Sequence, residues 1–344
     1  MKLAARLSFP LQRVLKVMAL LALTLASCAP VTLQTQTQTQ PAYTGELTPR
    51  PAGSPDVLLL SVAGRCPAPC RSPGDNLDYL TPRGTVQAVA SVLEARGLSV
   101  QGYGVAAALT THQPKRVVQA QIGAGKTVSA SQDGFVQLEE HLLAADRDWI
   151  RGRSNPTRIV LLAHSHGVVW THALARAHPE VPIAVMIDLD GICDFWESDN
   201  RRSIQDYVRG QGHTPWTFDL ADSCGSVRVG HLRYDLKDVV YPNVAVGLEV
   251  QSQRLLSRQD GSFVANLPFD SLQNIRPDGS RTGLSMYRAP GETHSRISYP
   301  ASRAVTWVTA QLNDLSTTWV PGRTPFAAPQ PADPVSATPA PSLP

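Results

Sequence analysis

Aromatic and charged residues are scarce in this sequence of 344 residues, at 6% and 17%. The formal net charge is only +3, and the four basic residues at positions 2, 6, 13 and 16 account for all of that excess. The rest of the sequence is close to neutral, which argues against a basic surface for nucleic acid. Hydrophobic residues reach 42%, which suits one large α/β domain or two small ones.

No apolar run is long enough to span a bilayer comfortably. The run at 17–23 follows basic residues and precedes Leu25-Ala26-Ser27-Cys28, so residues 1–27 are predicted to be a signal peptide. The Leu-Ala-Ser-Cys ending resembles a bacterial lipobox. That resemblance implies cleavage before Cys28 and attachment of diacylglycerol to its sulfur. Acyl chains would then anchor the protein to a membrane of the cell envelope, outside the cytoplasm.

Cysteine is also rare, with five residues. Once Cys28 carries lipid, an even number remains in an oxidising compartment, which indicates two disulfides. Three pairings are possible, and the local one is favoured: Cys66 with Cys70, and Cys193 with Cys224. A C-x3-C pair without a second pair at ligand spacing argues against a metal site.

No cofactor motif is complete. Residues 121–127 end in Gly-Lys-Thr, but the first glycine of a P-loop would fall on Ala120, and no apolar strand precedes it. Asp188, Asp190 and Asp194 could gather calcium, but their spacing does not fit an EF-hand loop. We therefore expect no cofactor, no metal and no nucleic-acid partner.

The most informative stretch is 156–179. An apolar run at 158–162 is followed by Ala163-His164-Ser165-His166-Gly167 and then by an apolar helical pattern. A strand, a small residue, x, Ser, x, Gly and a helix form the nucleophile-elbow pattern, in which flanking small residues leave room for a cramped turn. His164 and His166 could suggest a metal pair, but on such a turn their side chains should diverge.

At these residues the sequence resembles the α/β-hydrolase superfamily, and its lipase and esterase branches in particular. Ala163 departs from the usual glycine, although alanine fits sterically. The resemblance implies a mostly parallel sheet with helices on both faces and Ser165 as the nucleophile. It also implies an oxyanion hole formed by backbone N–H groups of Arg65, after the strand at 56–63, and of His166.

The resemblance orders a catalytic triad as serine, acid, histidine. His294 lies between the last predicted strand, 283–288, and the last helix, 301–312, where such hydrolases place the base. The acid stays open. Asp190 follows the strand after the elbow helix, and Asp188 is an alternative. Glu249 is another because it lies in an apolar run, with Asp260 further along.

The domain organisation follows from composition. A tether with a Gln-Thr repeat covers 28–55, the hydrolase domain 56–318, and a Pro- and Ala-rich tail 319–344 is predicted to be disordered. Helices are predicted at 85–96 and 132–151, and strands at 98–103, 181–190 and 243–251. Residues 191–240 read as an irregular, cap-like excursion after the strand that follows the elbow.

These patterns predict a lipid-anchored serine hydrolase that cleaves carboxylic esters, with a small-molecule ester or lipid as substrate. Two alternatives remain open at this point. One is a serine amidase or acyltransferase with the same nucleophile. The other is a hydrolase-like envelope scaffold that binds without turnover.

Overall fold

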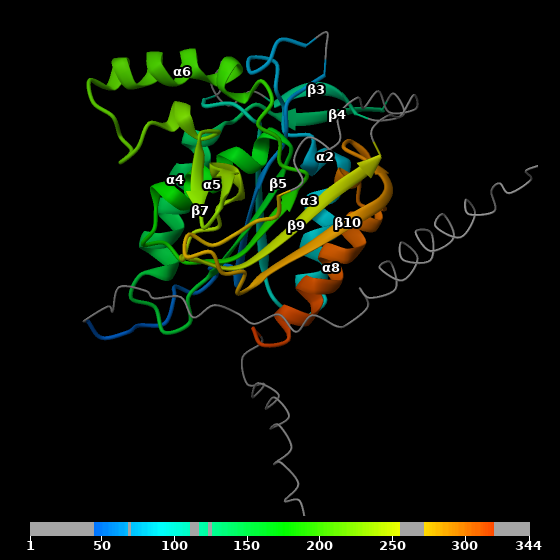
Figure 1. Cartoon of the computed structure of the whole chain (residues 1–344). Coiled ribbons are helices and arrows are strands. Elements are labelled where there is room, and N and C mark those ends of the chain that lie inside the picture. Colours follow the sequence, from blue (N-terminus) through cyan, green and yellow to red (C-terminus); the bar gives the residue numbers. More distant parts are fainter. Residues whose placement is uncertain (1–44, 68–69, 111–116, 123–125, 255–271, 320–344) are drawn as a thin grey trace, which may run out of the picture. The chain divides into compact units, whose positions relative to one another are not determined.

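The structure, a computed structural model, describes residues 45–67, 70–110, 117–122, 126–254 and 272–319 (Figure 1). The predicted signal peptide, Cys28, most of the tether and the tail beyond residue 319 lie outside these ranges. Asp260 also lies outside them. Within the described residues, no helix has both the length and the apolar character needed to cross a membrane.

A six-stranded sheet forms the centre of the domain, in the order β10-β9-β6-β5-β1-β2, and every neighbouring pair is parallel. Its strands are β1 (Val57–Val62), β2 (Val100–Val105), β5 (Arg158–His164), β6 (Ile183–Leu189), β9 (Val244–Arg254) and β10 (Leu284–Thr293). This is the strand order of the α/β-hydrolase fold, so the predicted fold class is confirmed.

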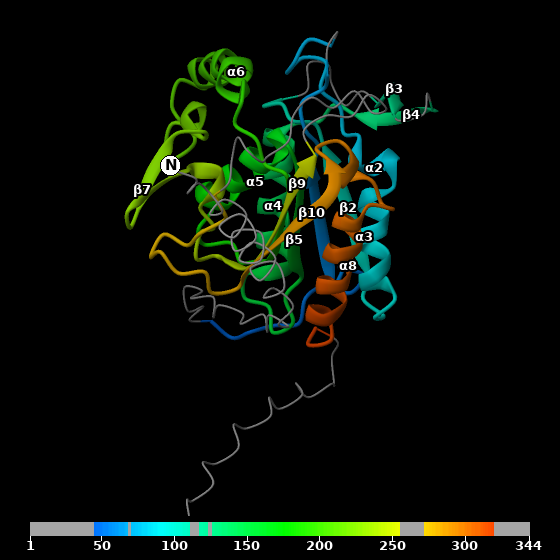
Figure 2. The ribbon, with the colours of Figure 1, turned by 45° about the vertical axis from the view of Figure 1, so that its right-hand side comes forward.

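Helices cover both faces of the sheet. Figure 2 shows α3 (Thr85–Glu94) and α8 (Arg303–Ser316) on one side, and α4 (Phe135–Ala145) and α5 (His166–Ala177) on the other. All residues of β1 are buried, which explains why its sequence is a continuous apolar run rather than an alternating one. The parallel order brings the C-terminal ends of β5, β6, β9 and β10 to one edge of the sheet.

Shorter elements complete the described domain. They are α2 (Leu80–Arg83), the hairpins β3 (Val117–Ile122) with β4 (Lys126–Ser131) and β7 (Ser226–Val229) with β8 (Leu232–Asp235), the π-helical turn η1 (Asp146–Ile150), and the 3₁₀ turns η2 (Leu220–Asp222), η3 (Leu236–Asp238) and η4 (Arg296–Ser298). The helix predicted at 132–151 is therefore α4 continued by η1. It begins at Phe135, where the Gln137 side chain accepts from the Gly134 N–H at 2.9 Å.

The expectation that 191–240 is irregular was wrong. This segment contains α6 (Trp196–Gln211), a helix of 16 residues, as well as β7 and β8. Only Trp196, Asn200 and Ile204 of α6 are buried, so its inward stripe is a single row at i, i+4 and i+8. In both views α6 lies beyond the end of the sheet to which the strands point (Figures 1 and 2).

Two disulfides stabilise the loops around this edge. Cys66 pairs with Cys70 and Cys193 pairs with Cys224, at Cα separations of 6.1 and 5.6 Å. The first closes the loop after β1. The second joins the start of the 191–240 segment to the residues before β7, and so closes the stretch of chain that contains α6.

Candidate active site

Ser165 occupies the turn between β5 and α5 in a backbone conformation that side chains rarely adopt, with φ 58°. The chain around it is fixed on both sides. The Ser165 N–H donates to the Leu189 carbonyl at 3.0 Å, and a Cβ added to Gly167 would collide with the carbonyl oxygens of Val62 and Ala63. The glycine two residues after the serine is therefore required by the close approach of α5 to β1.

His294 follows β10 directly and contacts Asp190, which follows β6. The His294 Nδ1 atom lies 2.7 Å from Asp190 Oδ2, and Asp190 is fully buried. Ser252 adds two hydrogen bonds to the same carboxylate, from its N–H to Oδ1 at 2.8 Å and from its hydroxyl to Oδ2. A buried carboxylate held by three donors can fix both the orientation and the tautomer of the histidine.

His164 connects the His294–Asp190 pair to the turn that carries Ser165. It immediately precedes Ser165, its ring stacks on the His294 ring with centroids 4.6 Å apart, and its Nε2 lies 2.8 Å from the His294 carbonyl oxygen. The structure thus joins His294 to Asp190, one of the acids that the sequence left open, and Ser165 directly follows His164, which contacts His294. Ser165, His294 and Asp190 follow the C-terminal ends of β5, β10 and β6.

The loop after β1 passes directly beside Ser165. A Cβ added to Gly64 would overlap with the Ser165 Cβ, so no other residue type fits there without displacement. The Gly64 N–H donates to the Tyr79 hydroxyl at 2.8 Å and is therefore occupied. Within the described residues, the backbone N–H groups of Arg65 and His166 have no hydrogen-bond partner. These are the two groups that the sequence suggested for an oxyanion hole.

The segment 191–240 contacts Arg65 and His166, which lie on either side of Ser165. The Arg65 Nε donates to Asp199 of α6 at 2.7 Å, and the Arg65 guanidinium lies 5.5 Å from the centroid of the exposed Phe195 ring. The His166 Nε2 donates to the Asp194 carbonyl at 2.7 Å. Burial lowers the pKa of His166 to about 4, so this ring is neutral. His164 and His166 have separate partners, and within the described residues no cluster of His, Cys, Asp or Glu could hold a metal ion.

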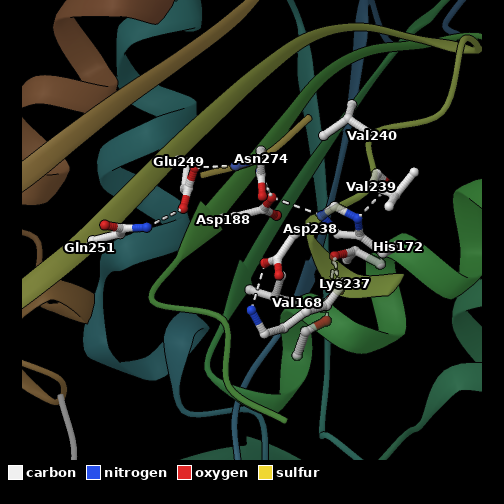
Figure 3. Close-up of polar contacts among 12 residues, drawn as sticks. Val168, His172, Asp188, Lys237, Asp238, Val239, Val240, Glu249, Gln251 and Asn274 are labelled. Carbon is white, nitrogen blue, oxygen red and sulfur yellow. Dashed lines mark hydrogen bonds and ion pairs between the residues drawn. The ribbon is translucent and has the colours of Figure 1, made fainter. Parts of the chain in front are cut away.

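The alternative acids have other partners, shown in Figure 3. Asp188 Oδ2 accepts from His172 Nε2 at 2.8 Å and from Asn274 Nδ2 at 2.7 Å. Glu249 lies opposite Asp188 on the neighbouring strand and accepts from the Gln251 side chain at 2.7 Å and the Asn274 N–H at 2.8 Å. Both carboxyl groups belong to a buried polar cluster that links β6 and β9 to α5 and to the segment around residue 274.

The charges in this cluster are arranged in pairs. Burial lowers the pKa of His172. The negative charge of Asp188 and its hydrogen bond raise that pKa by a larger amount, so the net shift is upward. Both ring nitrogens face acceptors, because Nδ1 lies 3.0 Å from the Val239 carbonyl, so His172 is an imidazolium paired with Asp188. Lys237 donates to Asp238 at 2.6 Å beside them.

Burial raises the pKa of Glu249 to about 7, well above its ordinary value of 4.5. The folded protein holds this proton more tightly than the unfolded chain does. The contribution of Glu249 to the free energy of unfolding is therefore fully present below pH 4.5 and is lost as the pH rises to 7. We expect the free energy of unfolding of the wild type, relative to Glu249→Gln, to fall by about 2–3 kcal/mol as the pH rises through this window. Urea unfolding at several pH values measures this difference.

The exposed Glu94 on α3 provides a matched control. Glu94→Gln should follow the wild-type pH dependence, because its carboxyl is in water in both states. Only the change with pH matters, so a constant difference in unfolding free energy between Glu249→Gln and the wild type does not affect the test. If the unfolding free energies of Glu249→Gln and the wild type changed with pH in parallel, a protonated, buried Glu249 would be contradicted.

No family model and no curated protein matches this chain. Among solved structures it is similar to the esterase domain of a Rhodothermus marinus protein, at 13% identity and TM-score 0.37, covering 79% of this chain and 91% of that one. It is also similar to a fungal esterase from Rhizomucor miehei, at 10% identity and TM-score 0.40, covering 79% of each chain. Est1E from Butyrivibrio proteoclasticus, with ferulic acid bound, gives 13% identity, TM-score 0.34 and coverage of 78% and 92%. The assignment of the fold rests on the strand order of the sheet.

Sequence reasoning missed Tyr79, as it missed Ser252. The Tyr79 hydroxyl lies between the Gly64 N–H and the His164 ring, 15 and 85 residues away along the chain. No motif surrounds it, and the residue lies just before the short helix α2. Only its contacts identify it.

Proposed function

We propose that this protein is a serine hydrolase that cleaves carboxylic esters through Ser165, His294 and Asp190. The observation that carries the proposal is the Asp190–His294 pair at 2.7 Å, next to a serine held at positive φ between a parallel strand and a helix. Such a serine, with a base oriented by a buried acid, is the arrangement that activates a hydroxyl as a nucleophile. All three residues follow the C-terminal ends of parallel strands of one sheet, which supports this assignment.

The chemistry follows from the roles of these groups. His294 Nε2 takes the proton of Ser165 Oγ as the oxygen attacks the ester carbonyl, and Asp190 stabilises the imidazolium that forms. The tetrahedral oxyanion is bound by the N–H groups of Arg65 and His166, of which the second lies at the N-terminus of α5. The imidazolium then protonates the leaving alcohol. Water, deprotonated by His294, then attacks the acyl carbon. The bond to Ser165 Oγ breaks, His294 returns the proton to Oγ, and the acid is released.

The location of the enzyme is part of the same proposal. The lipobox-like sequence at 25–28 would place the domain on the cell envelope with the tether between lipid and sheet. Two disulfides suit an extracytoplasmic compartment. The substrate would then be an ester or lipid that reaches the membrane surface.

Fluorophosphonate labelling tests the nucleophile. The protein without residues 1–27 is treated with the probe, and mass spectrometry locates the modified residue. We expect one label per chain, on Ser165, because only a serine with a positioned base reacts with such a probe at neutral pH. Heat-denatured protein is the control and should not be labelled.

Companion assays with a short-chain ester and the matching anilide distinguish the alternatives. Hydrolysis of the ester but not the anilide supports the proposal, and preferential cleavage of the anilide would indicate an amidase. A folded protein that is neither labelled nor active on either compound would contradict the hydrolase and favour a binding scaffold.

A further inference from the structure

A continuous chain of hydrogen bonds joins Gly64, in the loop after β1 that we call the oxyanion loop, to the base His294. The Gly64 N–H donates to the Tyr79 hydroxyl at 2.8 Å, the hydroxyl contacts His164 Nδ1, and His164 Nε2 lies 2.8 Å from the His294 carbonyl. Tyr79 itself is held in place by the Arg83 guanidinium, 4.3 Å from its ring centroid. His164 is almost fully buried, with 3% of its surface exposed.

The direction of each proton in this chain follows from the chemistry of the groups. The Gly64 N–H can only donate, so the Tyr79 oxygen accepts there and gives its own hydrogen to His164 Nδ1. The His294 carbonyl can only accept, so His164 Nε2 carries a hydrogen. His164 is therefore neutral and has one tautomer. Burial and the neighbouring His294 lower the pKa of His164 well below its ordinary value, in agreement with this assignment.

His164 constrains His294 in a way that Asp190 does not. Asp190 holds one ring nitrogen of His294 at its edge. His164 holds the backbone carbonyl of the same residue and covers one face of its ring, with an interplanar angle of 30°. The hydrogen bond with Asp190 alone would let the His294 ring rotate about that bond. The added contacts of His164 with the ring face and with the backbone carbonyl fix the position of the ring.

We propose that His164 and Tyr79 are positioning residues that hold the base His294 at a fixed position relative to the oxyanion loop at Gly64. This inference rests on the proposed function, because it assigns His294 the role of base. Neither residue touches the substrate. Their contribution is to keep the base and the N–H groups after β1 at a fixed separation while the oxyanion forms between them, where small displacements have large effects on rate.

Three variants separate the parts of this network. Tyr79→Phe removes only the hydroxyl that joins Gly64 to His164. His164→Gln keeps an acceptor for Tyr79 and a donor for the His294 carbonyl, but loses the ring face. His164→Phe keeps a ring face and loses both hydrogen bonds. Tyr103→Phe is the matched control, because the hydroxyl of Tyr103, on β2, also makes a hydrogen bond, to Asp133 at 2.6 Å.

The readout is the split between kcat and KM for ester hydrolysis, together with the rate of fluorophosphonate labelling. We expect Tyr79→Phe and His164→Phe to lower kcat and the labelling rate by roughly 10- to 100-fold while KM stays within about twofold, since ground-state binding groups are untouched. His164→Gln should recover most of the activity lost in His164→Phe. Tyr103→Phe should change none of these quantities.

Each outcome decides the inference. Wild-type protein that is labelled and active, with unchanged kcat in Tyr79→Phe and His164→Phe, overturns the positioning role alone. An equal loss in Tyr103→Phe overturns it too, because any lost tyrosine hydroxyl would then have the same effect. If His164→Phe does not fold by near-ultraviolet circular dichroism, Tyr79→Phe and His164→Gln decide. Wild-type protein without labelling or turnover removes the proposed function and this inference together.

Discussion

Ser165→Ala and His294→Ala are each expected to lower kcat for ester hydrolysis by roughly 10⁴- to 10⁶-fold, and the double variant should be no worse than either. Serine is a weak nucleophile without a base, and the base has no task without the serine, so removing either part removes the whole covalent route. The residual rate then comes from the oxyanion N–H groups and substrate binding alone.

Initial-rate kinetics of the three variants measure this effect, with thermal unfolding to show that each is folded. The exposed His213, whose only hydrogen bond among the described residues is to the Gln211 carbonyl, supplies the control variant His213→Ala. That variant should retain wild-type kcat. Losses in the single variants that multiply in the double variant would show that the two side chains act independently, which a triad does not allow.

The serine on the turn between strand and helix could be predicted because its signals are local. Residues 158–167 carry an apolar strand, a serine between small residues and the start of a helix, all within ten positions. The structure adds the reasons: β5 is buried, Ser165 has positive φ, and Gly167 lies against two carbonyl groups of β1. Each requirement restricts the residue type at its own position, so the pattern is visible in the sequence.

The acid could not be decided in this way. Asp188, Asp190 and Glu249 all lie at or near the ends of buried strands, and the sequence does not say which carboxylate faces the loop after β10. In the structure the choice depends on strand register and on one backbone angle. Asp190 lies one residue beyond β6 with φ 55°, and this turn points it to His294 rather than to the cluster around His172.

The buried polar cluster and the Tyr79–His164 chain were invisible for a related reason. Their members are joined over long stretches of sequence, such as 86 residues between Asp188 and Asn274. A lone buried histidine or tyrosine gives no indication of its partner. The helix α6 was missed because its inward face is one narrow row, and its other positions are polar, so its pattern is close to that of a solvated loop.

Asp190→Asn is expected to lower kcat by about 10³- to 10⁴-fold with little change in the fold. The Ser252 N–H can only donate, so it keeps the oxygen of the new amide at the position of Asp190 Oδ1. The amide nitrogen then replaces Oδ2, which faces His294 Nδ1. Because that nitrogen donates, His294 must carry its proton on Nε2. The nitrogen that should accept the serine proton is then blocked, and the imidazolium has no carboxylate beside it.

Asp188→Asn and Glu249→Gln are the matched variants for this prediction, since each makes the same change to a buried carboxyl on β6 or on the adjacent β9. Asp188→Asn removes the anion that pairs with His172, and should therefore lower the unfolding free energy while the folded enzyme keeps its kcat. Kinetics and urea unfolding on the three proteins separate the two effects. A loss of kcat in Asp188→Asn or Glu249→Gln as large as that in Asp190→Asn would contradict the assignment of the acid. The Asp190–His294 contact would then serve only the structure, and a carboxylate of the cluster around His172 would have to support the base instead.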